Sequence, residues 1–400
     1  MWYAFPSKTQ RPKDLCSVGG CQFGRMSLVS KLNPVQCHTG DPWLLGLAGG
    51  CSGAFAVMLS REGELLGVDQ EDLGMDWRES RYVGEPTTAI EVMLDRLTVA
   101  AGMTSRSELI QQISHLTLGI SGADPRFWPE LYTCAIEHIG FSRSVINVSS
   151  LSEVAHAAAF AGQPGLLVRA GHGSSAFLKL RDGSAILNGG WGSFVGDVGS
   201  ASWLGRKLVG LACSLEDGLV DQPAQNLVSS ILSIKNYQRI IELLQEVERE
   251  RYYSGGYRAR KRLWELGMHT LTRAEVGDPM ARRLLNKAVD QLVGSLRPLL
   301  SHIPCDTRVP LCIRGSMATA SPLFCQTLVE RLLDSSNSLE EGSDSGYSSA
   351  VGVGLLTLNQ AKPSALAQTR FLKAIKDHPQ SQKWGTDAQL YRRAFLGITQ

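Results

Sequence analysis

The sequence predicts a two-lobed α/β protein in which two related hairpin-and-helix units face one another across a cleft. The main observation is an internal repeat: Leu44 to Gly67 (LLGLAGGCSGAFAVMLSREGELLG) and Leu166 to Asn188 (LLVRAGHGSSAFLKLRDGSAILN) follow one pattern. Each copy has an apolar strand, a turn of small residues, a second strand from Ala-Phe, and a closing Glu-Gly or Asp-Gly turn. A length of 400 residues exceeds a usual single domain, and an apolar fraction of 43% is enough for two cores.

The repeat divides the chain into four segments. We expect a poorly ordered extension over residues 1–41, a first lobe over 42–140, a second lobe over 141–361, and a tail over 362–400 with one helix. Glycine lets a backbone approach an anion without a Cβ in the way. The turns at 48–53 and 170–175 therefore predict a nucleotide held between the two lobes.

Composition argues against several function classes. The formal charge is +2 and no basic stripe carries interleaved aromatic residues, which argues against nucleic acid as a partner. No apolar run approaches the ~20 residues of a membrane span, and the N-terminus lacks the apolar core of a secretory signal. Nine cysteines show no paired metal spacing, so we expect reduced thiols, a cytoplasmic protein and no structural metal.

In the first lobe, helical spacing over 86–102 and 105–113 is followed by a short apolar strand over 115–120. That strand leads into Ser121-Gly122-Ala123-Asp124. Asp124 is thereby expected at the carboxyl end of a strand, where ligands of α/β sheets usually lie. The alternative is that Asp124 caps a helix beginning at Pro125, and both roles can coexist.

In the second lobe, the segment 189–205 (GGWGSFVGDVGSASWLG) concentrates glycine, serine and tryptophan. Helices are expected over 227–253 and over 279–302, the latter with Asp278 as N-cap and Pro279 in its first turn. A strand over 309–313 ends in Arg314-Gly315-Ser316. A loop over 335–349 and helices over 351–361 and 365–375 complete the prediction.

These blocks, in this order, resemble the sugar-kinase branch of the actin-like ATPase superfamily, above all the N-acetylglucosamine kinases and the related BadF/BadG ATPases. The resemblance spans roughly residues 44–358 and rests on the following motifs: GLAGGCSGAF, SGAD, AGHGSS, GGWGSFVGDVGSASWLG, AEVGDPMARRLLNKA and CIRGSM. It implies an actin-like (RNase H-like) fold with an interlobe cleft. It also implies transfer of a phosphoryl group from ATP, with Mg²⁺, to the 6-hydroxyl of an N-acetylhexosamine.

The resemblance also assigns roles to residues of this chain. Asp124 would accept the proton of the sugar hydroxyl, and no direct metal ligand is assigned. The sugar would be bound by Gly190, Trp191, Gly192, Asp197, Ser174 and Ser175. The nucleotide would be bound by Gly49, Gly50, Ser52, Gly171, His172, Gly173, Gly315 and Ser316. The expected partner is a small sugar, and a homodimer is left open.

Local alternatives stand beside these roles. Trp191 could stack on a sugar face or fill the core, and Asp197 could bind a sugar hydroxyl or only the N–H groups of its own turn. His172 could donate a hydrogen bond to a phosphate or merely block the usual contact. The hydroxyls of Ser52 and Ser174 could bind ligand oxygens or their own backbone.

The chain departs from the family at positions that usually carry charge or polarity. Ala48 replaces an acid, Gly53 a basic residue, His172 a threonine, Met75 an asparagine and Val198 a glutamate. Candidates for a compensating acid are Asp41, Asp197 and Glu153, the last favoured by its place just before the second hairpin, although a solvated helix face also explains it. Two alternatives follow: a sugar- or nucleotide-binding protein with little catalysis, or a kinase for a less hydroxylated acceptor.

Overall fold

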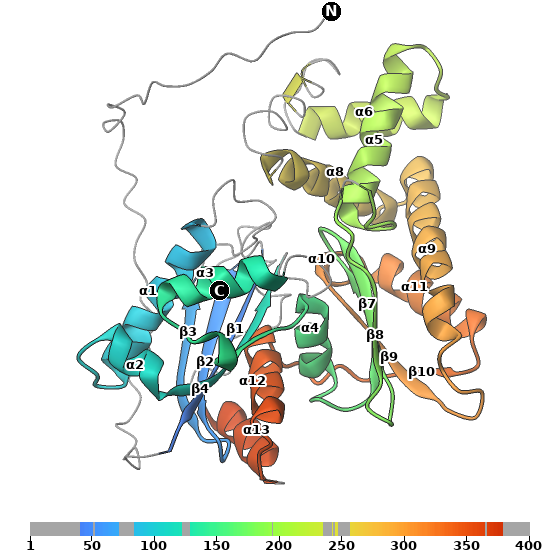
Figure 1. The fold of residues 1–400 in the computed structure, drawn as a ribbon. Coiled ribbons are helices and arrows are strands. Elements are labelled where there is room, and N and C mark those ends of the chain that lie inside the picture. The colour runs from blue at the N-terminus through green and yellow to red at the C-terminus, as the bar shows by residue number, and fades with distance from the viewer. Residues whose placement is uncertain are drawn as a thin grey trace, which may run out of the picture.

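The fold consists of two lobes, each built on its own five-stranded sheet (Figure 1). The computed structural model describes residues 41–50, 53–71, 84–121, 129–193, 195–234, 242, 245–246, 257–364 and 366–378. The sheets have the orders β3-β2-β1-β4-β5 and β10-β9-β6-β7-β8. The predicted two-lobed α/β architecture is therefore confirmed.

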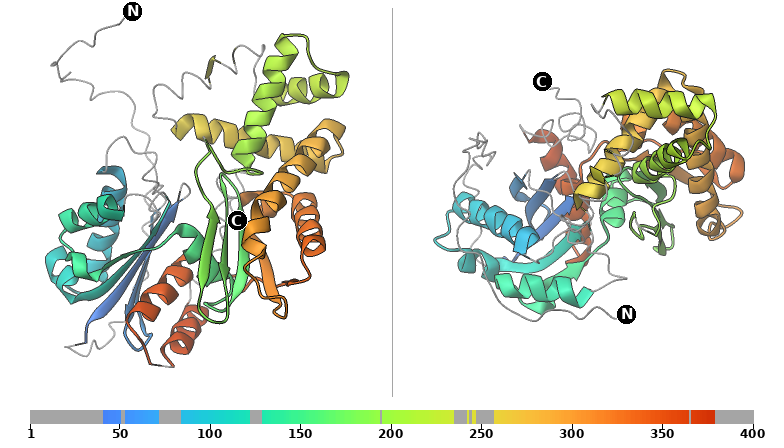
Figure 2. Two further views of the ribbon diagram at one scale, coloured as in Figure 1. Left: turned by 45° about the vertical axis from the view of Figure 1, so that its right-hand side comes forward. Right: turned by 90° about the horizontal axis from the view of Figure 1, so that it is seen from above.

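The first sheet contains β1 (Trp43–Gly50), β2 (Gly53–Ser60), β3 (Leu65–Glu71), β4 (Ile113–Ile120) and β5 (Ile146–Val148). Its helices are α1 (Gly84–Ala100), α2 (Arg106–Gln112) and α3 (Pro129–Ile139) on one face and α12 (Ser349–Gln360) and α13 (Ala367–Asp377) on the other (Figure 2). Strand β1 is apolar on both faces because both are covered: Leu45 packs toward α1 and Leu44 toward α12.

The second sheet contains β6 (Gly165–Ala170), β7 (Ser174–Lys179), β8 (Ala185–Gly189), β9 (Val309–Arg314) and β10 (Leu339–Glu341). Its helices are α5 (Ala201–Glu216), α6 (Gln222–Ile234), α8 (Tyr257–Glu275), α9 (Pro279–Leu300), α10 (Ser316–Ala320) and α11 (Pro322–Ser335). Strand β6 pairs antiparallel with β7 and parallel with β9, as β1 does with β2 and β4. The sequence repeat thus corresponds to a repeated sheet.

Helices α4 (Leu151–Ala159) and α12 join the lobes (Figure 2). Two glycines permit this joint, because a Cβ at Gly119 would overlap the side chain of Val154 and a Cβ at Gly352 would overlap its carbonyl oxygen. On its other side α4 packs Ala155 and Ala159 against the second sheet. Helix α4 therefore packs closely against both sheets, and its first residues lie beside the glycine turns.

Several elements differ from the sequence prediction. The expected helix over 227–253 is α6, which spans Gln222–Ile234, and most of the remainder lies outside the described residues. The expected loop over 335–349 contains β10, which pairs with β9. Strand β5 belongs to the first sheet although the predicted lobe boundary falls before it, and α12 packs on β1 and β2 although it was assigned to the second lobe. The chain therefore returns to the first lobe near its end. The segments 1–40 and 379–400 lie outside the described residues.

Candidate functional site

Three glycine-containing turns lie at the carboxyl ends of β1, β6 and β9. The first joins β1 to β2 after Gly49 and Gly50, the second is residues 171–173 between β6 and β7, and the third is Gly315 between β9 and α10. In open α/β sheets this edge is where ligands bind. The predicted nucleotide residues of the second and third turns are brought together, as the contacts between them show.

The second and third turns pack backbone to backbone. A Cβ at Gly171 would lie 3.2 Å from the Ser316 hydroxyl oxygen, and Gly315 has φ +121° with no room for a Cβ beside the carbonyl of Ala170. The indole N–H of Trp264, on α8, donates to the Ser316 hydroxyl over 3.2 Å. The same indole stacks on the His172 ring with centroids 4.4 Å apart and planes inclined by 12°. One aromatic side chain therefore contacts both of the turns that are predicted to bind nucleotide.

The sugar-binding segment predicted over 189–205 is attached to the second turn. A Cβ at Gly173 would lie 2.5 Å from the nearer carboxylate oxygen of Asp197, which is 7% exposed and has a left-handed φ of +52°. The Ser174 hydroxyl donates to the Val198 carbonyl over 2.8 Å, and the Gly190 N–H donates to the Ser174 carbonyl over 2.9 Å. The position of Asp197 therefore requires glycine at 173, and two hydrogen bonds connect the predicted sugar segment to the second turn.

Arg206, on α5, forms hydrogen bonds with the same segment. Its guanidinium donates to the carbonyls of Ser193 and Gly196, the latter over 3.3 Å. Burial lowers the pKa of Arg206, and the nearby negative charge of Asp197 partly offsets this effect. Trp191, in contrast, is 56% exposed, so its side chain does not fill the core. Gly190 and Gly192 flank Trp191 with left-handed φ values of +74° and +93°.

Helix α4 contacts the turns of both lobes through its first residues. Leu151 lies 3.5 Å from the position of a Cβ at Gly50, and the hydroxyls of Ser152 and Ser175 are 2.8 Å apart in a buried hydrogen bond. Ser175, predicted to bind sugar, is therefore bonded to the lobe joint. Ser121 donates its N–H to the Gly49 carbonyl over 2.7 Å, so β4 ends beside the first turn.

The candidate acids fall in three different environments. Asp41 is exposed and precedes β1, at the strand end opposite the first turn. Burial raises the pKa of Glu153. A hydrogen bond from Ser149 and the positive charge of Lys179, at the far end of β7, lower it by less. Asp197 is the candidate that adjoins a glycine turn. Across the described residues, no group of three or more His, Cys, Asp or Glu side chains is arranged to hold a metal ion.

Three predicted positions cannot be placed. Asp124, Ser52 and Met75 lie outside the described residues. Sequence reasoning also missed two residues of the site, Arg206 and Trp264. Arg206 carries a weak signal because it directly follows the glycine-rich segment 189–205. Trp264 carries none, since its partner Ser316 is 52 residues away.

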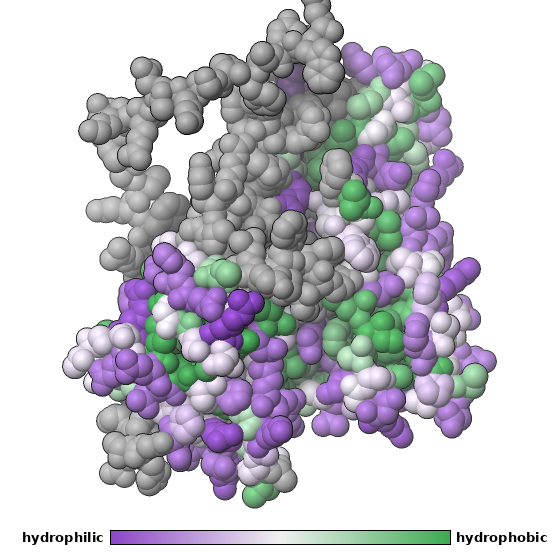
Figure 3. Space-filling view, in the orientation of Figure 1, coloured by the Kyte–Doolittle hydropathy of each residue, from purple (hydrophilic) through white to green (hydrophobic). Residues whose placement is uncertain are grey.

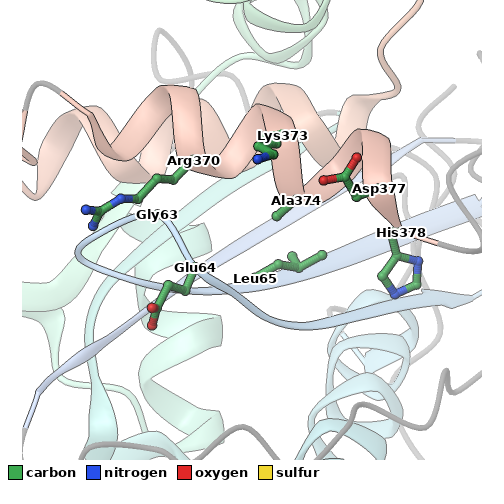
Figure 4. Close-up of a pocket in the computed structure, with 8 residues that line it drawn as sticks. All are labelled: Gly63, Glu64, Leu65, Arg370, Lys373, Ala374, Asp377 and His378. Atoms are coloured by element: carbon green, nitrogen blue, oxygen red, sulfur yellow. The ribbon is translucent and has the colours of Figure 1, made fainter.

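A separate pocket of about 500 Å³ lies away from the turns (Figure 4). It is formed by the β2–β3 turn, which includes Glu64, and by Arg370, Lys373, Asp377 and His378 near the end of α13. This turn lies at the end of β2 opposite Gly53, so the pocket is no part of the candidate site. On the face drawn in Figure 3, the described surface is mostly hydrophilic, with apolar residues gathered over β7 to β9 of the second lobe and in a smaller area of the first lobe. No helix within the described ranges is both long and apolar enough to span a membrane.

No family model matches the chain. A curated N-acetylmuramic acid/N-acetylglucosamine kinase of Clostridium acetobutylicum is 23% identical over 203 residues, which are 50% of this chain and 63% of that protein. The match thus spans less than two thirds of the curated relative's length.

Two solved structures share the fold. One is a proposed N-acetylglucosamine kinase of Chromobacterium violaceum, with a TM-score of 0.55 and 23% identity over 80% of this chain and 99% of that chain. The other is a proposed N-acetylglucosamine kinase of Porphyromonas gingivalis, with a TM-score of 0.53 and 19% identity over 79% of this chain and 99% of that chain. The chain therefore has the actin-like ATPase fold. In sequence it is distantly similar to the curated N-acetylmuramic acid/N-acetylglucosamine kinase, which agrees with the resemblance recognised in the sequence.

Proposed function

We propose that this chain is an ATP-dependent kinase that phosphorylates the 6-hydroxyl of an amino sugar, with N-acetyl-D-glucosamine as the first candidate. The observation that carries the proposal is the physical connection between the predicted nucleotide turns and the predicted sugar segment. The carboxylate of Asp197 rests against Gly173, while Gly171 rests against Ser316. A phosphoryl donor and a hydroxyl acceptor would therefore be positioned by one connected unit, which is most of what phosphoryl transfer requires.

In the proposed reaction Asp124 accepts the proton of the sugar 6-hydroxyl as its oxygen attacks the γ-phosphorus of ATP. The bond from that phosphorus to the β–γ bridging oxygen breaks, and ADP leaves with the electron pair. Two observations support a nucleotide there: Gly50 lies beside Leu151 of α4, and the Ser316 hydroxyl oxygen lies 3.2 Å from the Cβ position of Gly171 in the second turn. Mg²⁺ bound to ATP would neutralise developing phosphate charge, with Asp197 as the adjoining carboxylate.

The alternative is a sugar- or nucleotide-binding protein with little or no turnover. One observation favours it: Ala48, where the family usually has an acid, is fully buried against Val154 and Val353. This part of the first turn is occupied by apolar packing and offers no charge. A kinase with a less hydroxylated acceptor is a further alternative, which rests on Met75 alone.

The test is release of ADP from ATP and Mg²⁺ across a panel of hexosamines, with wild type, Asp124→Asn and Asp334→Asn. The Asp124→Asn change keeps the side-chain shape and removes the base, while Asp334 is an exposed residue of α11 that serves as the matched control. We expect sugar-dependent turnover that is lost in Asp124→Asn and kept in Asp334→Asn. Calorimetric binding of ATP or sugar without turnover in the wild type would support the binding protein instead.

A further inference from the structure

Trp264 and Ser316 share a hydrogen bond whose direction is fixed by the chemistry of the two groups. An indole N–H can only donate, so the Ser316 hydroxyl oxygen is the acceptor over 3.2 Å. A serine hydroxyl also has one proton to donate, and within the described ranges the structure shows no acceptor for it. Ser316 is half-buried, whereas Trp264 is 6% exposed. The pair therefore combines an enclosed donor with a more accessible hydroxyl whose proton can be given to a ligand.

The crossing of α5 and α8 sets the position of this indole. One helical turn after Trp264, a Cβ at Gly267 would overlap the carbonyl oxygen of Ala201, the first residue of α5. The N–H of the same Ala201 donates to the Gly171 carbonyl over 2.9 Å. The crossing therefore fixes α8 relative to the second turn. The stack of the indole on the His172 ring, with planes inclined by 12°, then fixes the plane in which the indole N–H lies.

The other end of α8 contacts the segment that follows the third turn. The carboxylate of Glu275 accepts from the Ser321 hydroxyl over 2.5 Å and from the Leu323 N–H over 2.9 Å, at the start of α11. Helix α10 lies between Ser316 and Ser321, so α8 bonds to both of its ends. Helix α8 thus positions the third turn and connects it to the second.

We propose that Trp264 is a positioning residue for nucleotide binding: its N–H orients the Ser316 hydroxyl, which donates to an oxygen of the nucleotide. This inference rests on the proposed function and deepens it. The acceptor is a phosphate or a ribose oxygen, since both accept a hydroxyl proton. Trp264 acts through Ser316 and does not touch the ligand. Without the indole the hydroxyl loses the donor that orients it, and its contribution to binding falls because it is no longer preorganised.

The test is a double-mutant cycle on nucleotide affinity. Calorimetry with ATP and with adenosine compares wild type, Trp264→Phe, Ser316→Ala and the double variant. The Trp264→Phe change keeps an aromatic ring beside His172 and removes the N–H. We expect each single change to weaken ATP binding about 3- to 10-fold, the value of one neutral hydrogen bond. The double variant should bind ATP as weakly as Ser316→Ala, within about 2-fold, because Trp264 acts only through the hydroxyl.

Trp43→Phe is the matched control. Trp43 is 7% exposed and lies at the start of β1, the strand end opposite the first turn. This control makes the same chemical change in a buried tryptophan far from the turns, and it should leave ATP affinity within about 2-fold of wild type. If Trp264→Phe does not fold, benzothienylalanine at position 264 provides the same comparison, because sulfur replaces the indole N–H in a ring system of similar size.

The nucleotide arms locate the acceptor. A loss of affinity for ATP alone places it on the phosphates, and an equal loss for adenosine places it on the ribose; both outcomes support the inference. If Trp264→Phe weakens ATP binding by the same factor with and without the Ser316 hydroxyl, Trp264 acts through packing alone. That result, or a wild-type ATP affinity in either single variant, overturns the inference while the kinase proposal stands. A wild-type protein that binds neither ATP nor adenosine overturns both.

Discussion

Two glycines of helix α5, Gly205 and Gly210, should respond differently to substitution by alanine. Helices α5 and α8 cross so closely that a Cβ at Gly205 would overlap the carbonyl oxygen of Leu263, and one at Gly267 would overlap that of Ala201. Gly210, further along α5, has nothing within 4 Å of its Cβ position. We therefore compare Gly205→Ala with Gly210→Ala, which make the same chemical change in the same helix.

The two substitutions should change the free energy of unfolding in opposite directions. A backbone carbonyl cannot rotate away, so Gly205→Ala must separate the helices at a cost of about 1–3 kcal/mol, offset by about 1 kcal/mol of helix propensity. Gly210→Ala gains the propensity alone and should stabilise the protein by about 0.5–1 kcal/mol. The expected difference between the variants is about 1–3 kcal/mol.

Urea unfolding followed by circular dichroism measures this difference, read from the midpoint shift at constant slope. The crossing also bears on the site, because the Ala201 N–H donates to the Gly171 carbonyl over 2.9 Å. We therefore expect Gly205→Ala to lower ATP affinity as well. A Gly205→Ala protein as stable as Gly210→Ala would refute the close crossing of α5 and α8.

Three further outcomes are expected. His156 is 1% exposed, and burial lowers its pKa to about 4 from 6.5. Between these pH values the unfolded state therefore binds a proton at His156 and the folded state does not. Stability should therefore fall by about 3 kcal/mol as pH drops from 6.5 to 4, and unfolding of His156→Gln across this range should lack that component. Arg206→Met, which frees two carbonyls of the sugar segment, should raise the KM for sugar at least about 10-fold with little change in ATP affinity, checked by steady-state kinetics and calorimetry. Burial raises the pKa of Cys312 to about 12, so iodoacetamide at pH 8 followed by mass spectrometry should label exposed Cys305 while Cys312 stays unmodified.

The parts of the fold that sequence could predict are those that local chemistry determines. The repeat predicted both hairpins because a buried strand, a small-residue turn and an alternating strand leave a pattern that needs no distant partner. The helix start at Asp278 was predicted for the same reason, and its carboxylate accepts from the N–H groups of Met280 and Ala281. Such elements are specified within a few residues of themselves.

Elements whose positions depend on distant contacts left no such pattern. Helix α4 is short and rich in alanine, and it is buried between the two sheets, so it shows no single apolar face. Strand β10 has three residues and exists through its pairing with β9. Trp264 belongs to the site because α8 crosses α5 and brings its indole to His172 and Ser316. These relations arise from packing between elements, which a single sequence does not encode locally.

Under the proposed function, nucleotide binding and turnover should depend on different lobes. His172, Ser316 and Trp264 all belong to the second lobe, whereas Ala48, near the end of β1 in the first lobe, is buried and carries no charge. Under the proposed function the second lobe carries most of the nucleotide affinity, and the first lobe contributes the base, Asp124. ATP affinity should therefore survive changes in the first lobe that abolish turnover. Loss of ATP affinity in Asp124→Asn would place the nucleotide's main contacts in the first lobe and would contradict this division of roles.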